Sequence, residues 1–248
     1  MNDHELAARL ATEAGQLLLA ARAELADAPA EERKAQGDRR SHEFLMEELH
    51  RARPADAVLS EEGIDDTTRL SSARVWIVDP LDGTREFSEL GRDDWAVHVA
   101  LWSDGELTAG AVALPGQGVT LATPAVPAPP PPAATPRILI SRTRPPTVAR
   151  RVCDQLGGTL VEMGSAGAKV CAVVQGRAEV YVHAGGQYEW DSAAPVAVAK
   201  AAGLHTSRAD GSALRYNQAD SMLPDLLVCR PQYAAAALRA LAAAGSPE

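Results

Sequence analysis

Two aspartates stand three residues apart in the segment WIVDPLDGTRE (76–86), where an apolar run ends. Asp79 closes that run, and Asp82 follows after one proline and one leucine. Proline fixes the local backbone and glycine permits a tight turn, so these neighbours favour a kinked strand end that puts both carboxylates on one side. The chemistry of the pair then depends on which other groups reach the same place.

Two further acids occupy comparable positions, because Glu61 follows a short apolar run and Asp191 stands at the predicted start of a helix. Strand ends and helix starts are where α/β proteins place functional groups. Four carboxylates in one cleft would repel one another, and some would bind protons, unless cations lay between them. Oxygen ligands without histidine or cysteine indicate Mg²⁺ or Mn²⁺, and an acid shared by two ions is typical of phosphoryl chemistry.

The spacing within the segment suggests a division of roles. Asp79 can bridge two ions while Asp82 binds one of them, and the intervening proline lets the Leu81 carbonyl point inward as a further oxygen ligand. Gly83 permits a close turn, which leaves backbone N–H groups and the Thr84 hydroxyl near a bound phosphate. The segment therefore predicts a phosphate site beside a metal site.

The elements that must position these groups alternate along the first half of the chain. Leucines at helical spacing and short apolar runs predict the following elements: a helix over 3–25, a helix over 41–52 with Ser41 as its N-cap, strands over 57–60 and 74–78, and a hairpin over 95–115 with its turn at Asp104-Gly105. Histidines on these faces, such as His98, are interpreted as structural.

A proline-rich segment, TPAVPAPPPPAATP (123–136), cannot donate ladder hydrogen bonds at its prolines and is expected to be an exposed, extended connection. We therefore expect two halves, 1–134 and 135–248. The second half is predicted to contain strands over 137–141, 159–163 and 178–184, helices over 147–157 and 165–176, a helix from the N-cap Asp191 to Gly203, and a final strand and helix over 226–245. This alternation indicates α/β or mixed layers.

Composition limits the classes of partner. The 248 residues suffice for one large domain or two small domains that share a cleft. The net charge of −9 argues against a nucleic-acid polymer as the main partner, because no basic stripe could neutralise its phosphates. Three widely spaced cysteines predict neither a disulfide framework nor a zinc site, and no segment reads as a signal peptide or a membrane span. We therefore expect a cytoplasmic protein.

Three motifs together resemble one family. WIVDPLDGTREF, with SEEG (60–63) before it and EWDSAAPVAVAKAAG (189–203) after it, resembles the inositol monophosphatase superfamily of Mg²⁺-dependent, lithium-sensitive phosphatases, over nearly the whole chain. GTREF and SRTRPP (141–146) are most similar to the CysQ branch, whose members hydrolyse the 3′-phosphate of adenosine 3′,5′-bisphosphate, a by-product of sulfate assimilation. The resemblance implies a layered αβαβα sandwich with an α+β half that holds most metal ligands and an α/β half that contributes substrate contacts.

The resemblance also implies roles for single residues. Glu61, Asp79 and the Leu81 carbonyl would hold one Mg²⁺, while Asp79, Asp82 and Asp191 would hold a second. Water activated by these ions would attack the phosphorus in line, without a covalent enzyme intermediate.

The remaining implied roles concern the water and the substrate. Thr84 would orient the attacking water with an acid as partner, a role that Asp38 could fill, and Glu61 is a further catalytic residue. Asp38 lies in RKAQGD, which is expected to be a loop that covers the site, and it could instead bind a third ion. Ser165 and Lys169 would contact the nucleotide, with Lys169 at its 5′-phosphate, although Ser165 could also simply cap a helix. The full substrate-binding set implied is Glu61, Leu81, Asp82, Gly83, Thr84, Ser165, Lys169 and Asp191.

Several alternatives stay open at this stage. Related enzymes act on inositol 1-phosphate or fructose 1,6-bisphosphate, and they occur as monomers and as dimers. Haloacid-dehalogenase-type phosphatases share the ending LDGT, but their two aspartates are two residues apart, whereas Asp79 and Asp82 are three apart. A degenerate family member could also sense a nucleotide or a metal without turnover.

Overall fold

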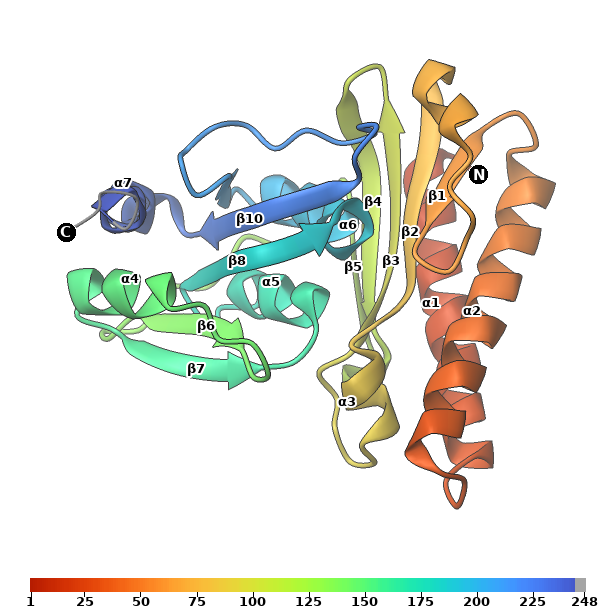
Figure 1. Ribbon diagram of the computed structural model, residues 1–248, viewed down its shortest axis with the longest axis horizontal. Helices are drawn as coiled ribbons and strands as arrows, with labels where there is room; N and C mark the ends of the chain where they lie inside the picture. Colours follow the sequence, from red (N-terminus) through yellow and green to blue (C-terminus); the bar gives the residue numbers. More distant parts are fainter. Residues whose placement is uncertain (244–248) are drawn as a thin grey trace.

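Two five-stranded sheets organise the chain in the computed structural model, which describes residues 1–243 (Figure 1). The first sheet has the order β1-β2-β3-β4-β5, with bounds β1 Ala57–Ser60, β2 Arg74–Asp82, β3 Ala96–Ser103, β4 Glu106–Leu114 and β5 Val119–Ala122. The second has the order β7-β6-β8-β10-β9, with bounds β6 Arg137–Ser141, β7 Thr159–Met163, β8 Val180–Tyr188, β9 His205–Ser207 and β10 Met222–Cys229.

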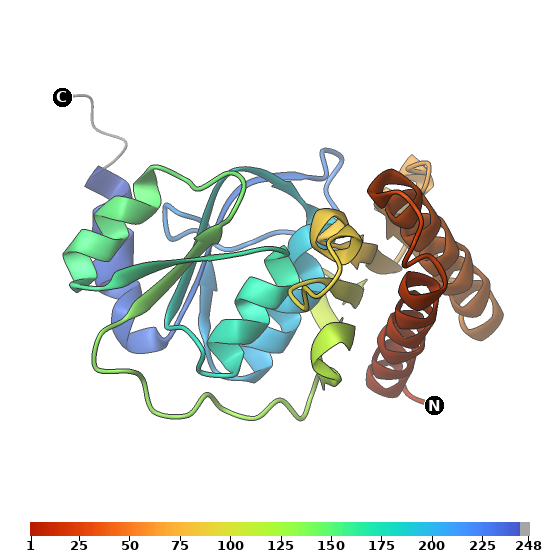
Figure 2. The ribbon, with the colours of Figure 1, turned by 90° about the horizontal axis from the view of Figure 1, so that it is seen from below.

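The helices form three layers around the two sheets. Their bounds are α1 Asp3–Glu24, α2 Ala30–Ala52, α3 Thr84–Ser88, α4 Val148–Leu156, α5 Ala166–Val174, α6 Glu189–Ala201 and α7 Pro231–Ala242, with short 3₁₀ turns at Thr67–Ser71 and Pro115–Gln117. Helices α1 and α2 cover the outer face of the first sheet, α5 and α6 lie between the sheets, and α4 and α7 cover the second sheet (Figures 1 and 2). The predicted layered αβαβα sandwich is confirmed.

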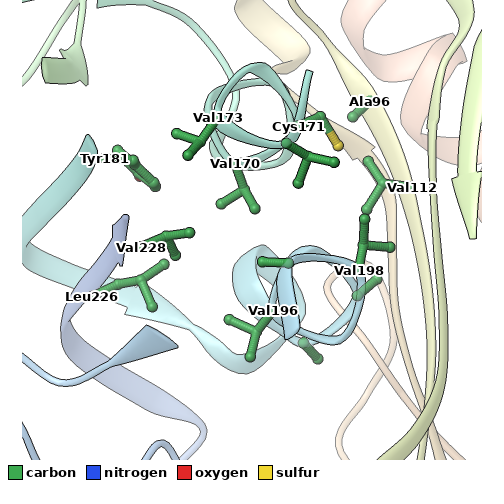
Figure 3. Close-up of a cluster of buried hydrophobic side chains, with 14 of the residues drawn as sticks. Ala96, Val112, Val170, Cys171, Val173, Tyr181, Val196, Val198, Leu226 and Val228 are labelled. Atoms are coloured by element: carbon green, nitrogen blue, oxygen red, sulfur yellow. The ribbon is translucent and has the colours of Figure 1, made fainter. Parts of the chain in front are cut away.

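The central layer holds the two sheets together. Small and β-branched side chains dominate it, and every residue of α5 is buried (Figure 3). Gly110 of β4 is an example of this close packing, because a Cβ atom there would lie 2.6 Å from the Cβ of Ala197 on α6. A core of Ala, Val and Leu therefore brings sheet and helix close enough for residues of both halves to meet.

The second helix is longer than predicted. It begins at Ala30 with Pro29 as its N-cap, so the expected loop RKAQGD is helical and the expected cap Ser41 is wrong. Ser41 is fully buried inside α2, where its hydroxyl donates a 2.7 Å hydrogen bond to the carbonyl of Pro80. Gly37 explains the close approach, since a Cβ atom there would lie 2.7 Å from Phe87 and 2.9 Å from Leu81.

The strand that carries the paired aspartates is kinked as expected. In the antiparallel pairing of β2 with β3, Asp79 lies opposite His98 and Asp82 opposite Ala96, with an irregular step between them. Gly83 then adopts φ +87°, a left-handed conformation that glycine tolerates best, and α3 starts at the next residue. Both carboxylates are therefore presented at the end of the first sheet.

Other expectations have mixed outcomes. The hairpin turn at Asp104-Gly105 is confirmed, with φ +50° and +95°, and residues 123–136 form a mostly exposed connection without helix or strand. Strands β5 and β9 were not predicted, and the final predicted segment reaches residues 244–245, which lie outside the described residues. Within residues 1–243, no helix combines the length and the apolar character needed to cross a membrane.

Candidate active site

A cleft of about 510 Å³ opens where the two halves meet. Its walls come from the residue after β1, the end of β2 with the turn into α3, the end of β6 with the segment after it, the start of α5, and β8 with the start of α6. Nine residues predicted from the sequence line it: Glu61, Asp79, Leu81, Asp82, Gly83, Thr84, Ser165, Lys169 and Asp191. The structure thus brings together groups that are up to 130 positions apart in the chain.

Three aspartates come together in this cleft. Asp79, Asp82 and Asp191 each offer a carboxylate oxygen, and these oxygens all lie within 4.8 Å of one another. Asp79 and Asp82 are buried, with exposed fractions of 1% and 7%. Such a group of oxygens has the spacing and chemistry of a divalent-cation site.

Crowding changes the proton affinity of these acids. Burial, together with the charges of Glu61, Asp82 and Asp191, raises the pKa of Asp79 well above its ordinary value. Burial also raises the pKa of Glu61 to about 7, with contributions from neighbouring carboxylates, and that of Asp191 to about 6, with a contribution from Asp82. Without a cation, the cluster is therefore electrostatically unfavourable at neutral pH.

Asp82 is the exception within the cluster. Its carboxylate accepts hydrogen bonds from the Ser165 hydroxyl (2.5 Å) and from the backbone N–H groups of Ala166 (3.1 Å) and Gly167 (2.6 Å) at the start of α5. Burial raises its pKa, but His98 and these donors outweigh burial and lower the pKa to about 2. Asp82 is therefore an anion held by the second half of the chain.

His98 was interpreted as a structural histidine, and the structure places it in direct contact with the cluster. Its Nε2 lies 3.1 Å from the Asp82 carboxylate, and its Nδ1 donates to the carbonyl of Trp190 at 2.9 Å. Burial alone would lower its pKa, but the Asp82 charge outweighs burial and raises it. His98 thus connects Asp82 to the residue that precedes Asp191.

Asp191 does not cap its helix in the predicted way. Helix α6 begins at Glu189 with Tyr188 as its N-cap, and the Asp191 carboxylate accepts a 2.6 Å hydrogen bond from the Tyr188 backbone N–H. The buried Glu189 carboxylate instead accepts from the N–H groups of Asn217 and Gln218, away from the cluster. The helix start therefore orients Asp191 alone toward Asp79 and Asp82.

Asp38 reaches the site from α2 rather than from a loop. The Thr84 hydroxyl lies 3.4 Å from the Asp38 carboxylate and 3.1 Å from the Leu81 carbonyl, and it can donate to either. Burial, with the charge of Glu62, raises the pKa of Asp38 to about 7 despite the Thr84 contact. The expected proximity of Asp38 and Thr84 is confirmed, whereas the expected loop is wrong because the segment is helical.

Leu81 shows how the turn is held. Its N–H donates to the Asp79 carboxylate at 3.0 Å, and its carbonyl accepts from Thr84. Ser165 has two roles, because it bonds Asp82 and also caps α5 by accepting from the Ala168 N–H at 2.9 Å.

Two cationic side chains on the wall are already engaged. The Lys169 ammonium donates to the carbonyls of Met163, Gly164 and Ser165 at 3.4, 3.2 and 2.6 Å, and burial lowers its pKa to about 8. Arg142 pairs with Glu86 at 2.7 Å and with Glu89 at 3.0 Å.

Arg144 differs from both of these cations. It lines the same cleft, and its guanidinium has no acidic partner or hydrogen bond among the described residues. His183 lines the same cleft, and the charge of Arg144 contributes, after burial, to the lowered pKa of that histidine. Arg144 therefore offers free donors to an anionic ligand.

The donor set of the cluster fits a hard divalent cation. All the candidate ligands are carboxylate or carbonyl oxygens, and the raised pKa values of Asp79, Glu61 and Asp191 reflect burial and, after it, the negative charge of neighbouring carboxylates. A cation among them would offset that charge.

Comparisons with known proteins agree with this geometry. The 3′-phosphoadenosine 5′-phosphate phosphatase of Mycobacterium bovis is 55% identical over 240 residues, which cover 93% of this chain and 90% of that protein. The 3′(2′),5′-bisphosphate nucleotidase CysQ of Escherichia coli K12 is 31% identical over 74% of this chain and 79% of its own length. The crystal structure of CysQ from Bacteroides thetaiotaomicron, 26% identical, superposes with a TM-score of 0.76 and covers 92% of this chain and 97% of that chain.

A sequence model of the inositol monophosphatase family matches residues 3–125 and 137–245. Members of this family are metal-dependent, in keeping with the acidic cluster described above. The match, the identities and the shared fold lead to one conclusion: this chain belongs to the inositol monophosphatase family.

Proposed function

We propose that this protein is a Mg²⁺-dependent phosphatase that hydrolyses the 3′-phosphate of adenosine 3′,5′-bisphosphate to give AMP and phosphate. The observation that carries the proposal is the set of three carboxylates, Asp79, Asp82 and Asp191, whose oxygens lie within 4.8 Å of one another in a cleft. The substrate comes from the activity named for the Mycobacterium bovis relative, which is 55% identical. Lithium sensitivity and a place in sulfate assimilation are part of the same proposal.

We assign two or three Mg²⁺ ions, replaceable by Mn²⁺, to the acidic cluster. The residues that would hold them are Glu61, Asp79, the Leu81 carbonyl, Asp82 and Asp191. When bound, the ions lower the pKa of a coordinated water and offset charge on the phosphoryl oxygens. Asp82 already accepts from Ser165 and Gly167 at Oδ2, which also contacts His98, and from Ala166 at Oδ1, so its carboxylate has a fixed direction and Oδ1 keeps a lone pair for an ion.

Thr84 and Asp38 would handle the attacking water. The Thr84 hydroxyl can donate to Asp38 or to the Leu81 carbonyl, which leaves its oxygen lone pairs free to accept a hydrogen bond from that water. A carboxylate with a pKa of about 7, as at Asp38, suits proton acceptance near neutral pH. Glu61, with a pKa also raised to about 7, is the second candidate acceptor.

The reaction would be an in-line displacement. The water oxygen bonds to phosphorus while the bond from phosphorus to the 3′-oxygen breaks, and the 3′-oxygen leaves with a proton as the hydroxyl of AMP. The start of α6, which carries Asp191, adds a weak positive end toward the cleft. No side chain forms a covalent bond to phosphorus in this scheme.

The second phosphate requires a cation elsewhere in the cleft. Ser165 and Lys169 stay assigned to the substrate wall, and Lys169 contributes positive charge there although its donors contact three carbonyls. Arg144 has free donors in the same cleft, so we assign the direct contact with the 5′-phosphate to it.

The cellular setting and the assembly follow from the same features. We propose a cytoplasmic location, which the three free, buried cysteines Cys153, Cys171 and Cys229 support. The halves 1–134 and 135–248 would act together, the first with most metal ligands and the second with Asp191 and substrate contacts. All site residues come from one chain, so the proposal holds for a monomer and for a homodimer.

The test is phosphate release from adenosine 3′,5′-bisphosphate, fructose 1,6-bisphosphate and inositol 1-phosphate, compared by kcat/KM with Mg²⁺ and repeated with added Li⁺. We expect a preference for the nucleotide and inhibition by lithium. Preference for a sugar or inositol phosphate would keep the metal site and replace the substrate. Nucleotide binding without release would indicate a sensor, and an aspartyl-phosphate trapped on Asp79 would indicate the haloacid-dehalogenase mechanism.

A further inference from the structure

A stacked aromatic pair stands at the rim of the cleft and takes no part in the chemistry described above. The rings of Tyr188 and Trp190 lie nearly parallel, with centroids 4.8 Å apart and planes 10° apart. Trp190 packs against the central core, whereas Tyr188 is 47% exposed and lines the cleft. One face of the Tyr188 ring is therefore covered by Trp190, and the ring is otherwise open to the cleft.

The pair is fixed to the acidic cluster through the backbone. The Tyr188 N–H donates to the Asp191 carboxylate at 2.6 Å, and the Trp190 carbonyl accepts from His98 at 2.9 Å. Stacking on a residue anchored in the core also restricts the Tyr188 ring. A ligand that used this ring would therefore lose little free energy to ordering the protein.

The strand that leads to the ring contains two glycines. Gly185 and Gly186 precede Tyr188 in β8, and a Cβ atom on Gly185 would meet no atom within 4 Å, while one on Gly186 would meet only Met222, at 3.8 Å. Both glycines have positive φ, so the strand bends here. Gly186 and Tyr188 both line the cleft, so a restrained aromatic face borders its open volume next to a position without a side chain.

The aromatic rim differs from the rest of the cleft in carrying no charged side chain of its own. The floor is acidic and suits cations that hold a phosphate, while Arg144 suits a second anion. A half-exposed tyrosine serves neither purpose, but its ring offers a π-face to a planar, apolar group. Purine bases bind such faces by stacking.

We propose that Tyr188 is the platform on which the base of the nucleotide stacks. This inference rests on the proposed function, because it places the 3′-phosphate at the acidic cluster. The base is then one ribose away from that phosphate, just as Tyr188 lies next to the cluster through its bond to Asp191. Trp190 supports the platform from behind and does not contact the base.

Equilibrium binding of AMP and of ribose 5-phosphate tests the proposal, because the two ligands differ only in the base. Isothermal titration calorimetry with Mg²⁺ present would use the wild-type protein, Tyr188→Phe and Tyr188→Ala. We expect the wild type to bind AMP at least about tenfold more tightly than ribose 5-phosphate, a modest value for base stacking on an aromatic ring. Tyr188→Phe should keep this ratio, and Tyr188→Ala should reduce it to near unity.

The affinity for ribose 5-phosphate is the internal control for folding, since a collapsed site would lose both ligands together. If Tyr188→Ala also failed to bind ribose 5-phosphate, Tyr188→Leu would decide, because leucine keeps bulk over Trp190 but lacks a π-face. An affinity ratio of AMP to ribose 5-phosphate near unity in Tyr188→Leu would support stacking. An unchanged ratio in either non-aromatic variant, or no preference for AMP in the wild type, overturns the inference. Failure of the proposed function is distinct, because it appears as no phosphate release from the bisphosphate by the wild type.

Discussion

Asp79 and Glu179 are both buried carboxylates, with exposed fractions of 1% and 0%, yet their proton affinities shift in opposite directions. Glu179 accepts hydrogen bonds from the Arg137 guanidinium and from the N–H groups of Arg137 and Ala133. Burial raises its pKa, but these donors outweigh burial and hold the pKa below its ordinary value. The protein itself therefore supplies everything that this charge requires.

Asp79 has the opposite surroundings. The charges around it are those of other carboxylates, and the Leu81 N–H donates one hydrogen bond to it, so burial and neighbouring negative charge together raise its pKa. The difference teaches that burial of an acid does not distinguish structure from function. What distinguishes them is whether the fold supplies the compensating charge or leaves it to a ligand.

The largest effect is expected at Asp82, which belongs to the acidic cluster and also has its charge compensated by protein groups. Asp82→Asn should reduce phosphate release by about a thousandfold, because an anionic ligand is lost. It should also destabilise the fold by about 3 kcal/mol, because the charge that pairs with His98 and accepts from Ser165 and Gly167 disappears. Kinetics and urea unfolding measure the two losses, and an unchanged unfolding midpoint would refute the structural half.

Asp79→Asn should lose activity to a similar extent, about a thousandfold, without the loss of stability. Removing one charge from a group of carboxylates relieves repulsion, so the metal-free variant should unfold at the same urea concentration as the wild type or a higher one. Unfolding in EDTA checks this. A clear drop in stability would mean that Asp79, like Glu179, has its charge satisfied by the protein.

Glu179→Gln should show the reverse pattern. Loss of the charge that binds Arg137 should cost about 3 kcal/mol of unfolding free energy, while kcat/KM of the folded protein stays unchanged. Glu106→Gln, at an exposed position at the start of β4, is the matched control and should change stability by less than about 0.5 kcal/mol. Equal stability of the two variants would contradict the comparison.

The metal-free protein should become more stable as the pH falls from 8 to 5. The folded-state pKa values of Glu61 (about 7) and Asp191 (about 6) lie above their ordinary values, so their cost is full above pH 7 and is relieved as they bind protons toward pH 5. Thermal unfolding in EDTA should therefore show a rising Tm across this range. A flat or falling Tm would exclude an uncompensated cluster.

The same unfolding measurement with added Mg²⁺ in place of EDTA tests whether the ion stabilises the protein. At a hundredfold excess over its Kd, the ion should contribute about 2.7 kcal/mol at pH 8. The gain should be smaller at pH 5, where protons compete for the same carboxylates. Asp79→Asn should show a reduced gain at pH 8.

The smallest effect is expected at Arg144, which differs from the neighbouring Arg142 in having no acidic partner among the described residues. Arg142 is paired with Glu86 and Glu89, as Arg137 is with Glu179. Arg144→Gln should raise the KM for adenosine 3′,5′-bisphosphate by about tenfold and leave kcat nearly unchanged, since one charged hydrogen bond is lost. The KM for 3′-AMP, which lacks the 5′-phosphate, should change little. Equal effects on both substrates would rule out this contact.

Much of the cleft could be predicted from the sequence because its acids stand at points where apolar runs end. Glu61, Asp79, Asp82 and Asp191 follow or begin regular elements, and the turn chemistry of proline and glycine gave the kink in β2. Such local signals can be recognised in the sequence without knowledge of the tertiary fold.

The beginning of α2 was missed because Gly37 was read as part of a loop. The structure shows that glycine serves packing there, since any Cβ atom would strike Phe87 and Leu81. Ser41 was read as a cap for the same reason, although it bonds a carbonyl from another element. Tertiary contacts of this kind leave no local pattern to recognise.

His98 was missed because a single histidine on a strand has no motif. One signal was available: strand alternation puts His98 on the same face as Ala96 and Ala100, which lie in the central core. A polar side chain on such a face requires a buried partner, and the partner proved to be Asp82.

The exposed proline-rich connection lies outside the pattern that defines the family. The family model matches residues 3–125 and 137–245 and leaves residues 126–136 unmatched, so the shared pattern does not depend on this stretch. Lengthening a flexible connection costs little free energy, and most of this stretch is exposed. Natural insertions, or an engineered reporter domain, can therefore enter here without disturbing the carboxylates that the two halves bring together.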